Sequence, residues 1–120
     1  MWTNLVAGAF NVPTPNIPAL STDNRIALLK QALAQLKQYR DNQMTSNPSP
    51  RWGGGDSRPS MIFVAPEYMF TAPGFQLSSA KDLKRNRFLS RGEHDGIVGR
   101  LQEISAEYGK QLVLVPGSIA

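Results

Sequence analysis

The chain has 120 residues, with 13 lysines and arginines against 9 acidic residues, so its formal charge is +4, and it contains no cysteine. The lack of cysteine excludes a disulfide scaffold, a thiolate zinc site, an iron–sulfur cluster and a cysteine nucleophile supplied by these residues. A hydrophobic fraction of 41% with 18% charged residues is typical of a globular protein and excludes a wholly disordered chain. One domain, or part of one, is the expected content.

The first predicted element is a strand at Trp2 to Asn11, an apolar run without helical spacing that a series of prolines follows. Ser21, Thr22 and Asp23 then offer N-cap side chains. Apolar residues at helical spacing predict an amphipathic helix over about 23–40, and they are Ile26, Leu29, Leu33 and Leu36. The polar face of this helix is expected to hold Lys30, Gln31, Lys37, Gln38 and Arg40.

Two irregular segments flank a second predicted strand. Residues 41–60 are polar, rich in proline, glycine and serine, and without a period, so they predict a surface loop. Met61 to Ala65 is a continuous apolar run between two prolines. Because both sides of its pleat are apolar, it predicts a central strand that is covered on two faces. A second irregular loop is expected over about 71–92.

A second helix and a third strand complete the chain. Apolar residues at spacings of four, three and four predict the helix, and they are Ile97, Leu101, Ile104 and Tyr108. Ser90 with Glu93 fits a capping box at its start, and Gly109 stands where a left-handed C-terminal cap is expected. Gln111 to Val115 is the third apolar strand, which a proline and a glycine end.

The order strand, helix, strand, helix, strand is typical of right-handed crossovers in a parallel sheet, so the predicted fold class is α/β. A three-stranded sheet of this kind leaves a long apolar edge unprotected, which natural proteins avoid. We therefore expect residues 1–120 to be the first part of a larger domain or one half of an interface. The N-terminus lacks a basic region, and no stretch reaches the roughly 18 to 20 apolar residues of a membrane helix, so a cytoplasmic protein without a membrane partner is expected.

Glu67 is the first candidate for chemistry, because it comes directly after the predicted central strand. Open parallel sheets bind their ligands at the carboxyl ends of their strands. A carboxylate at that edge is expected to be partly desolvated, as general bases often are. The alternative is a structural role, in which Glu67 caps a turn or pairs with an arginine of residues 81–91.

Two short motifs of this chain resemble the N-terminal part of the carbon–nitrogen hydrolase (nitrilase) superfamily. The first is Phe63 to Tyr68, a hydrophobic strand that ends in Pro-Glu. The second lies one helix later in Tyr108 to Ile119, and its hydrophobic strand ends in Gly117-Ser118. The likeness covers the whole chain in order. It implies an α-β-β-α sandwich, of which residues 1–120 form the N-terminal portion of a single domain.

The resemblance also implies a chemistry. In that family a glutamate, a lysine and a cysteine form the catalytic triad, and only the glutamate carries over, as Glu67. The lysine and the cysteine would lie beyond Ala120, so the 120 residues alone are expected to be inactive. The complete protein would hydrolyse an amide, carbamoyl or nitrile bond of a small molecule without metal or cofactor, and it would form a homodimer. Tyr68 and Phe70 are the candidates for substrate binding, and packing under the loop is their alternative role.

Two other functions stay open at this point. Asn11 after the first strand and Glu67 after the second are similar in position to the Mg²⁺-binding residues of phosphodiesterases of the endonuclease/exonuclease/phosphatase type. The other alternative is a non-catalytic, truncated module that binds a small ligand or pairs with another subunit through its open edge.

The net charge is concentrated in residues 81–91, where five cations stand against Asp82, and they are Lys81, Lys84, Arg85, Arg87 and Arg91. Such a patch can hold a phosphate or a carboxylate-bearing substrate or can bind nucleic acid, and the alternative is a solvated loop that faces water or an acidic partner subunit, so its role stays open. Phe88 is the only aromatic residue in this segment, so RNA stacking is not indicated and a nucleic-acid partner is not expected. The nearby run Glu93-His94-Asp95 is interpreted as a helix N-terminus rather than a metal site.

Overall fold

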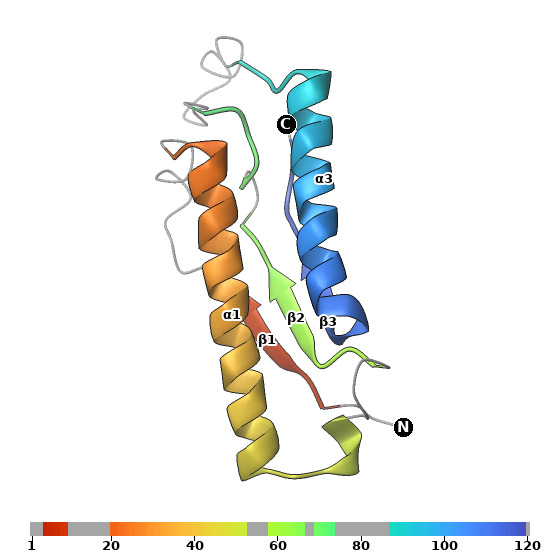
Figure 1. The fold of residues 1–120 in the computed structure, drawn as a ribbon. Coiled ribbons are helices and arrows are strands. Elements are labelled where there is room, and N and C mark those ends of the chain that lie inside the picture. Colours follow the sequence, from red (N-terminus) through yellow and green to blue (C-terminus); the bar gives the residue numbers. More distant parts are fainter. Residues whose placement is uncertain (1–3, 10–19, 53–57, 67–68, 74–86, 120) are drawn as a thin grey trace.

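A computed structural model describes residues 4–9, 20–52, 58–66, 69–73 and 87–119 (Figure 1). Strands and helices alternate along the chain, in the order β1 (Val6–Ala9), α1 (Thr22–Ser46), β2 (Met61–Val64), α3 (Arg91–Tyr108) and β3 (Leu112–Val115). Two short 3₁₀ turns precede the second and third strands, and they are η2 (Pro50–Trp52) and η4 (Gly109–Gln111). The predicted element order and the α/β class are therefore confirmed.

The three strands form one parallel sheet in the order β1-β2-β3, so the predicted central position of β2 is confirmed. Val6, Met61 and Leu112 stand side by side at its start, and the register continues unbroken to the last residue of each strand. Both helices lie on the same face of the sheet (Figure 1), with α1 against β1 and β2 and α3 against β3. Two right-handed crossovers that advance in the same direction across a sheet produce this arrangement.

The helices cover only one face of the sheet, which corrects the expectation that the central strand is covered on both. Met61 and Phe63 face the helices and are 1% and 2% exposed, whereas Val64 points to the other face and is 46% exposed. Val113 and Val115 of β3 are exposed to a similar extent. The run is apolar on both sides, as its sequence indicates, but no second layer of described residues covers the outer side.

Helix α1 begins at its predicted cap, because the hydroxyl of Ser21 accepts a hydrogen bond of 3.1 Å from the backbone N–H of Asn24. Its apolar stripe packs on the sheet, and its most deeply buried residues are Ile26, Leu29 and Leu33.

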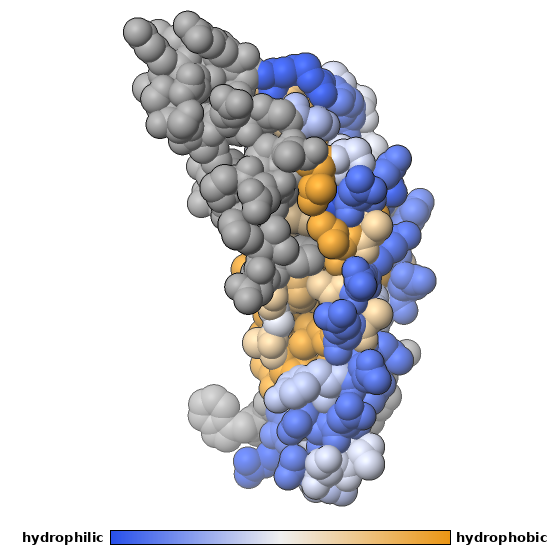
Figure 2. All heavy atoms as spheres, turned by 90° about the vertical axis from the view of Figure 1, so that its left-hand side faces the viewer, coloured by the Kyte–Doolittle hydropathy of each residue, from blue (hydrophilic) through white to orange (hydrophobic). Residues whose placement is uncertain are grey.

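The outer surface of the helical side is mainly hydrophilic, beside an apolar band along the sheet (Figure 2). No helix in the described part of the chain is both long and apolar enough to cross a membrane.

The same helix continues past its expected end at about residue 40 and stops at Ser46. The backbone N–H of Asn47 closes its last turn by donating to the carbonyl of Gln43 at 2.8 Å. The loop expected at about 41–60 is therefore wrong for residues 41–46. Their polar composition suggested a loop, but Met44 packs against the core and continues the inner face of the helix.

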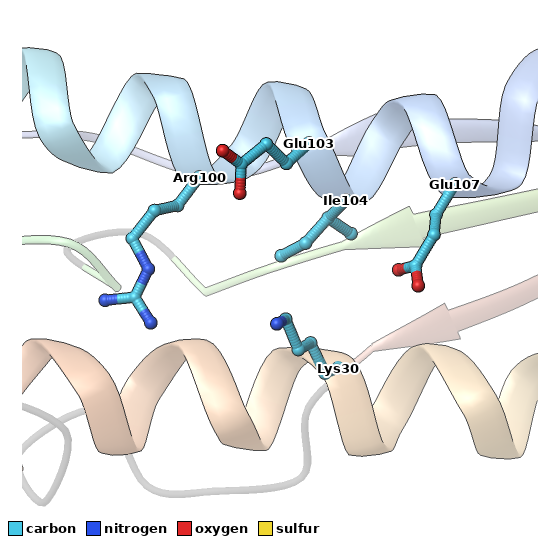
Figure 3. A pocket seen from close by; sticks show the side chains of 5 residues that line it. All are labelled: Lys30, Arg100, Glu103, Ile104 and Glu107. Atoms are coloured by element: carbon cyan, nitrogen blue, oxygen red, sulfur yellow. The ribbon is translucent and has the colours of Figure 1, made fainter.

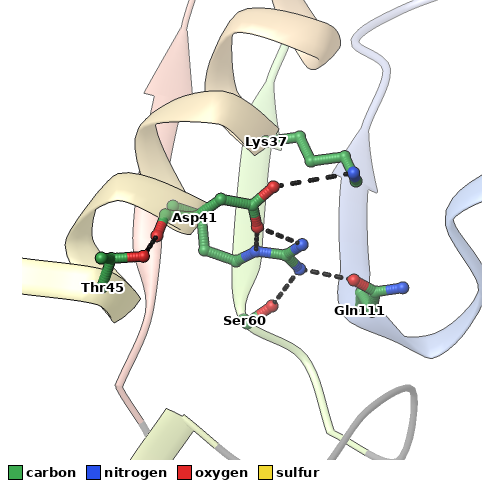
Figure 4. Close-up of polar contacts among 6 residues, drawn as sticks. Lys37, Asp41, Thr45, Ser60 and Gln111 are labelled. Carbon is green, nitrogen blue, oxygen red and sulfur yellow. Dashed lines mark hydrogen bonds and ion pairs between the residues drawn. The ribbon is translucent and has the colours of Figure 1, made fainter. Parts of the chain in front are cut away.

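Arg40, which was expected on the polar face of α1, is only 6% exposed and connects the helix to the amino end of the sheet. Its Nη1 donates to the hydroxyl of Ser60 at 2.8 Å and to the side-chain oxygen of Gln111 at 2.5 Å (Figure 4). Its Nε and Nη2 donate to the carboxylate of Asp41 at 3.1 and 2.9 Å. Because Ser60 and Gln111 directly precede β2 and β3, this side chain holds the starts of both strands against the helix.

Close approach of α1 to the sheet depends on Gly8 in β1. A β-carbon at this position would lie 3.2 Å from a methyl carbon of Leu36 and 3.2 Å from the ring of Phe63, which is tighter than ordinary van der Waals contact. The missing side chain therefore lets the helix pack directly on the strand.

Helix α3 begins at the predicted capping box. The hydroxyl of Ser90 accepts from the backbone N–H of Glu93 at 3.1 Å, and the Glu93 carboxylate accepts from the backbone N–H of Ser90 at 3.0 Å. Arg87 donates to the same carboxylate at 2.7 Å. The hydrogen bonds from Arg87 and from the Ser90 backbone lower the pKa of Glu93 to about 2. At the other end Gly109 has the expected positive φ, 61°, although its ψ of −144° is not that of a left-handed helical turn.

Replacing Gly8 by valine is expected to destabilise the chain by roughly 1–3 kcal/mol, because the added carbons would overlap Leu36 and Phe63. The measurement is the urea midpoint at constant m-value. Ala7→Val is the matched control, since Ala7 is the neighbouring strand residue on the exposed face, and its effect is expected to stay within about 0.5 kcal/mol. Equal losses for both variants would contradict the packing role of Gly8.

Glu93→Gln is expected to lower the thermal midpoint at pH 7. The pKa of this carboxyl falls from its usual 4.5 to about 2 on folding, so the charged form stabilises the fold above pH 4.5 and this contribution is lost as the pH falls through 2. The difference in midpoint between parent and variant should therefore shrink below pH 4.5 and vanish only below pH 2. A difference that stays constant over a calorimetric pH series would be evidence against the Arg87–Glu93 contact.

Candidate functional site

The candidate site is the carboxyl end of the sheet, where β2 leads into the segment that carries Glu67 in the sequence. Glu67 and Tyr68 lie outside the described residues, as does Asn11. The residues on either side, 65–66 and 69–73, are described. They define how the chain enters and leaves the position of the predicted base.

The segments that follow β2 and β3 lie side by side beyond the strands. Ala65 donates its backbone N–H to the carbonyl of Val115 at 2.8 Å, which extends the pairing of the two strands. Further along, Phe70 and Ile119 form an isolated parallel bridge. The described residues of the two sequence motifs are therefore neighbours at one end of the sheet.

Pro66 is held on two sides. Its carbonyl accepts the backbone N–H of Met69 at 3.1 Å, so the residues that flank Glu67 and Tyr68 in the sequence are joined to each other. Gly117 of the other motif has a φ of 78°, and a β-carbon there would overlap the Pro66 carbonyl oxygen. Only glycine suits both this backbone angle and this close approach, which gives the glycine of the Gly-Ser motif a physical reason.

Arg25 of α1 is the residue at this end of the sheet that the sequence analysis missed. Its side chain is 0% exposed, and its guanidinium extends to the segment after β2. Nη1 donates to the backbone carbonyls of Met69, at 3.2 Å, and of Thr71, while Nε donates to the carbonyl of Leu20 at 3.1 Å. Burial lowers the pKa of this guanidinium from its usual value, yet an arginine stays protonated at neutral pH.

One signal in the sequence could have identified Arg25 as an inward-facing residue. It stands four residues before Leu29 and eight before Leu33, and residues at this spacing share one face of a helix. The position therefore belongs to the buried stripe, and only the polar character of the residue argues for solvent.

The segment that Arg25 contacts is fully enclosed. Met69, Phe70, Thr71 and Ala72 are all 0–1% exposed. Complete burial of Phe70 is what the packing role requires, and a contact of its ring with substrate stays a prediction. Tyr68, the other predicted substrate-binding residue, lies outside the described residues.

Two of the five cations in residues 81–91 are described, and both face acids of α3. Arg87 pairs with Glu93 at 2.7 Å, and Arg91 lies 4.0 Å from Asp95. The run from Glu93 to Asp95 lies at the start of α3, with Glu93 in its first turn, which confirms its interpretation as a helix N-terminus. Among the residues that the structure describes, no three potential metal ligands cluster together.

The hollows between the two helices lie on the helical side of the molecule. One, of about 290 Å³, is lined by side chains of both helices that mix cations and acids around a buried isoleucine (Figure 3), and these are Lys30, Arg100, Glu103, Ile104 and Glu107. Another, of about 240 Å³, lies near the first turns of both helices, where Asp23 and Arg100 form an ion pair of 2.5 Å. Neither hollow includes a residue that follows β2 or β3, so both are separate from the candidate site.

Comparisons with known proteins add no relative: no family model, no curated protein and no solved structure matches this chain. The resemblance to carbon–nitrogen hydrolases therefore rests on the two short motifs and stays a prediction.

Gly117→Ala is expected to destabilise the chain by roughly 1–4 kcal/mol, because a β-carbon would collide with the Pro66 carbonyl and because alanine disfavours a positive φ. The matched control is Gly96→Ala in α3, where nothing lies within 4 Å of an added β-carbon and a gain of up to about 1 kcal/mol is expected. Urea denaturation measures both changes. A Gly117→Ala chain as stable as the parent would disprove the close Pro66–Gly117 contact.

Proposed function

We propose that this chain is the N-terminal portion of a carbon–nitrogen hydrolase-like domain and that Glu67 is its general base. The observation that supports this most is the pairing of the two motif segments: they follow neighbouring parallel strands, and Gly117 packs against Pro66. The carboxyl end of a parallel sheet is where α/β proteins bind their ligands. A glutamate that directly follows this packed proline is therefore the best candidate for a reacting group.

In the proposed reaction Glu67 removes the proton of a cysteine thiol that residues outside 1–120 supply, since this chain contains no cysteine. The thiolate attacks the carbonyl or nitrile carbon of a small amide, carbamoyl or nitrile substrate. A lysine, also from outside these residues, stabilises the negative charge that develops on the substrate. For an amide or carbamoyl substrate, Glu67 returns the proton to the departing amine. For a nitrile, Glu67 gives the proton to the substrate nitrogen, and addition of one water then expels that nitrogen as ammonia. In each case Glu67 next activates the water that releases the acyl group from sulfur, and the thiolate regains its proton. No cofactor takes part.

The open face of the sheet supports the α-β-β-α sandwich that belongs to this proposal. Val64, Val113 and Val115 are 41–46% exposed, and an apolar face of this kind is buried when a second sheet packs about 10 Å away. An apolar hollow of about 250 Å³ between α3 and β3 includes Leu114 and Ile119. In the proposed domain, further elements would pack at this hollow, beside α3 and β3. A homodimer of complete domains, with Tyr68 and Phe70 near the substrate, is part of the same proposal.

The open face also favours a second candidate function, a non-catalytic module that pairs with another chain. The two candidates differ in what covers the face: a sheet of the same protein in the hydrolase, and a separate subunit in the module. The Mg²⁺-dependent phosphodiesterase rests on Asn11 and Glu67, and no contact among the described residues adds to it.

The test uses the protein expressed from the complete coding region that contains these residues. We expect it to release ammonia or an amine from at least one amide, carbamoyl or nitrile substrate. Glu67→Gln should lower kcat by roughly 10²–10⁴-fold, as the loss of a general base does. Glu107→Gln, which changes an exposed acid of α3, is the matched control and should retain activity.

Three outcomes would overturn the proposal. The first is turnover by the 120-residue chain alone that survives Glu67→Gln. The second is full activity of the complete Glu67→Gln protein. The third is a coding region without a downstream lysine and cysteine, which would favour the non-catalytic module. Apart from these three, a rise of the thermal midpoint with Mg²⁺ would favour the phosphodiesterase instead.

A further inference from the structure

The backbone after β2 is held by a side chain from helix α1. One nitrogen of Arg25, Nη1, donates to the carbonyls of both Met69 and Thr71. These two carbonyls are two residues apart. A single nitrogen can donate to both only when the backbone between them brings the two carbonyl oxygens close together. Because these acceptors are main-chain atoms, the hydrogen bonds constrain the backbone of residues 69–71 directly.

The other contacts of this segment continue the constraint toward the candidate site. Met69, which Arg25 holds through its carbonyl, donates its own N–H to the carbonyl of Pro66 at 3.1 Å. Pro66 is in turn packed against Gly117. The chain is thus held at Pro66 and at Met69, and Glu67 stands between these two residues in the sequence.

The position of Arg25 in its helix argues that its role concerns this segment rather than the helix itself. It lies in the first turns of α1, four residues after the cap Ser21. The N-terminus of a helix carries partial positive charge, so a cation there gains nothing from the helix dipole. Burying a guanidinium also costs free energy unless its donors are satisfied. The contacts with Leu20, Met69 and Thr71 supply that compensation.

We propose that Arg25 is the positioning residue of the candidate site: through the carbonyls of Met69 and Thr71 it sets the backbone from which the Glu67 segment is presented. This inference rests on the function proposed for Glu67. Arg25 acts on the reaction through the backbone and has no contact with substrate in this scheme.

The test compares Arg25→Lys with Arg40→Lys. Both arginines are buried on the inner face of α1, but Arg40 contacts the amino end of the sheet, through Ser60 and Gln111. Lysine keeps the charge and loses the planar fork that satisfies several acceptors at once. The two variants therefore share the chemical change and differ in the end of the sheet that they disturb.

Hydrogen exchange in the 120-residue chain is the first measurement. Arg25→Lys should accelerate exchange of the backbone amides of residues 69–72 by about tenfold or more, relative to amides of the β2 core, and Arg40→Lys should not. A second measurement needs no substitution: the Nε and Nη protons of Arg25 should exchange slowly with water in the parent chain. Rapid exchange of these protons would overturn the proposal even if Arg25→Lys failed to fold.

Kinetics of the complete protein are the other measurement. Arg25→Lys should lower kcat by about ten- to a hundredfold with little change in KM, since a small displacement of a reacting group has this effect. It should also move the acidic limb of the kcat pH profile, whereas Arg40→Lys should leave that profile unchanged.

Equal effects of the two variants on exchange and on kcat would show that Arg25 is only a structural residue and would overturn the inference. Absence of carbon–nitrogen hydrolase activity in the parent protein would instead overturn the proposed function. In that case the exchange measurements still decide whether Arg25 holds residues 69–72, so the two failures are distinguishable.

Discussion

Two buried arginines at opposite ends of helix α1 connect that helix to both ends of the sheet. Arg25 donates to backbone carbonyls beyond the carboxyl end of β2, and Arg40 donates to side chains that directly precede β2 and β3. Burial of the apolar stripe between them stabilises the contact of helix and sheet, but the hydrophobic effect is non-directional. Hydrogen bonds, in contrast, are directional. The arginines thus set the position of the helix along the sheet. Among the described residues no buried side-chain nitrogen or oxygen lacks a hydrogen-bond partner, so this polar anchoring leaves none of them unsatisfied.

The parts of the fold that the sequence predicts are those that local rules determine. Apolar periodicity and capping at Ser21 and Ser90 depend on residues within one or two turns, so they can be read directly. The roles of Arg25 and Arg40 depend on partners 44 and 71 residues away. A hydropathy pattern assigns an arginine to the solvent side and contains no information about such distant acceptors. The extension of α1 through Ser46 could not be predicted for a similar reason. Residues 41–46 are polar apart from Met44, and the contact of Met44 with the core depends on the fold.

The candidate site likewise has a part that the sequence predicts and a part that it does not. The motifs around Pro66 and Gly117 can be recognised in the sequence, but their contact is a property of neighbouring strands and of one positive φ. Likewise, the β2 run is apolar on both sides, yet the pattern cannot tell which layer covers each side or whether that layer belongs to the same subunit. Val64 and its neighbours on the outer face are therefore the part of the architecture that the sequence constrains least.

The parallel register has a consequence for how this chain folds. Val6 pairs with Met61, so the sheet can begin only after a long stretch of chain has closed into a loop, and such non-local pairing is slow. Helix α1 fills 25 residues of that loop, and a helix of this length can form locally before any strand pairs. Once formed, the helix shortens the loop that has to close. It also presents its apolar stripe and both guanidinium groups to the strands, so the strands can pair while they pack against one rigid element.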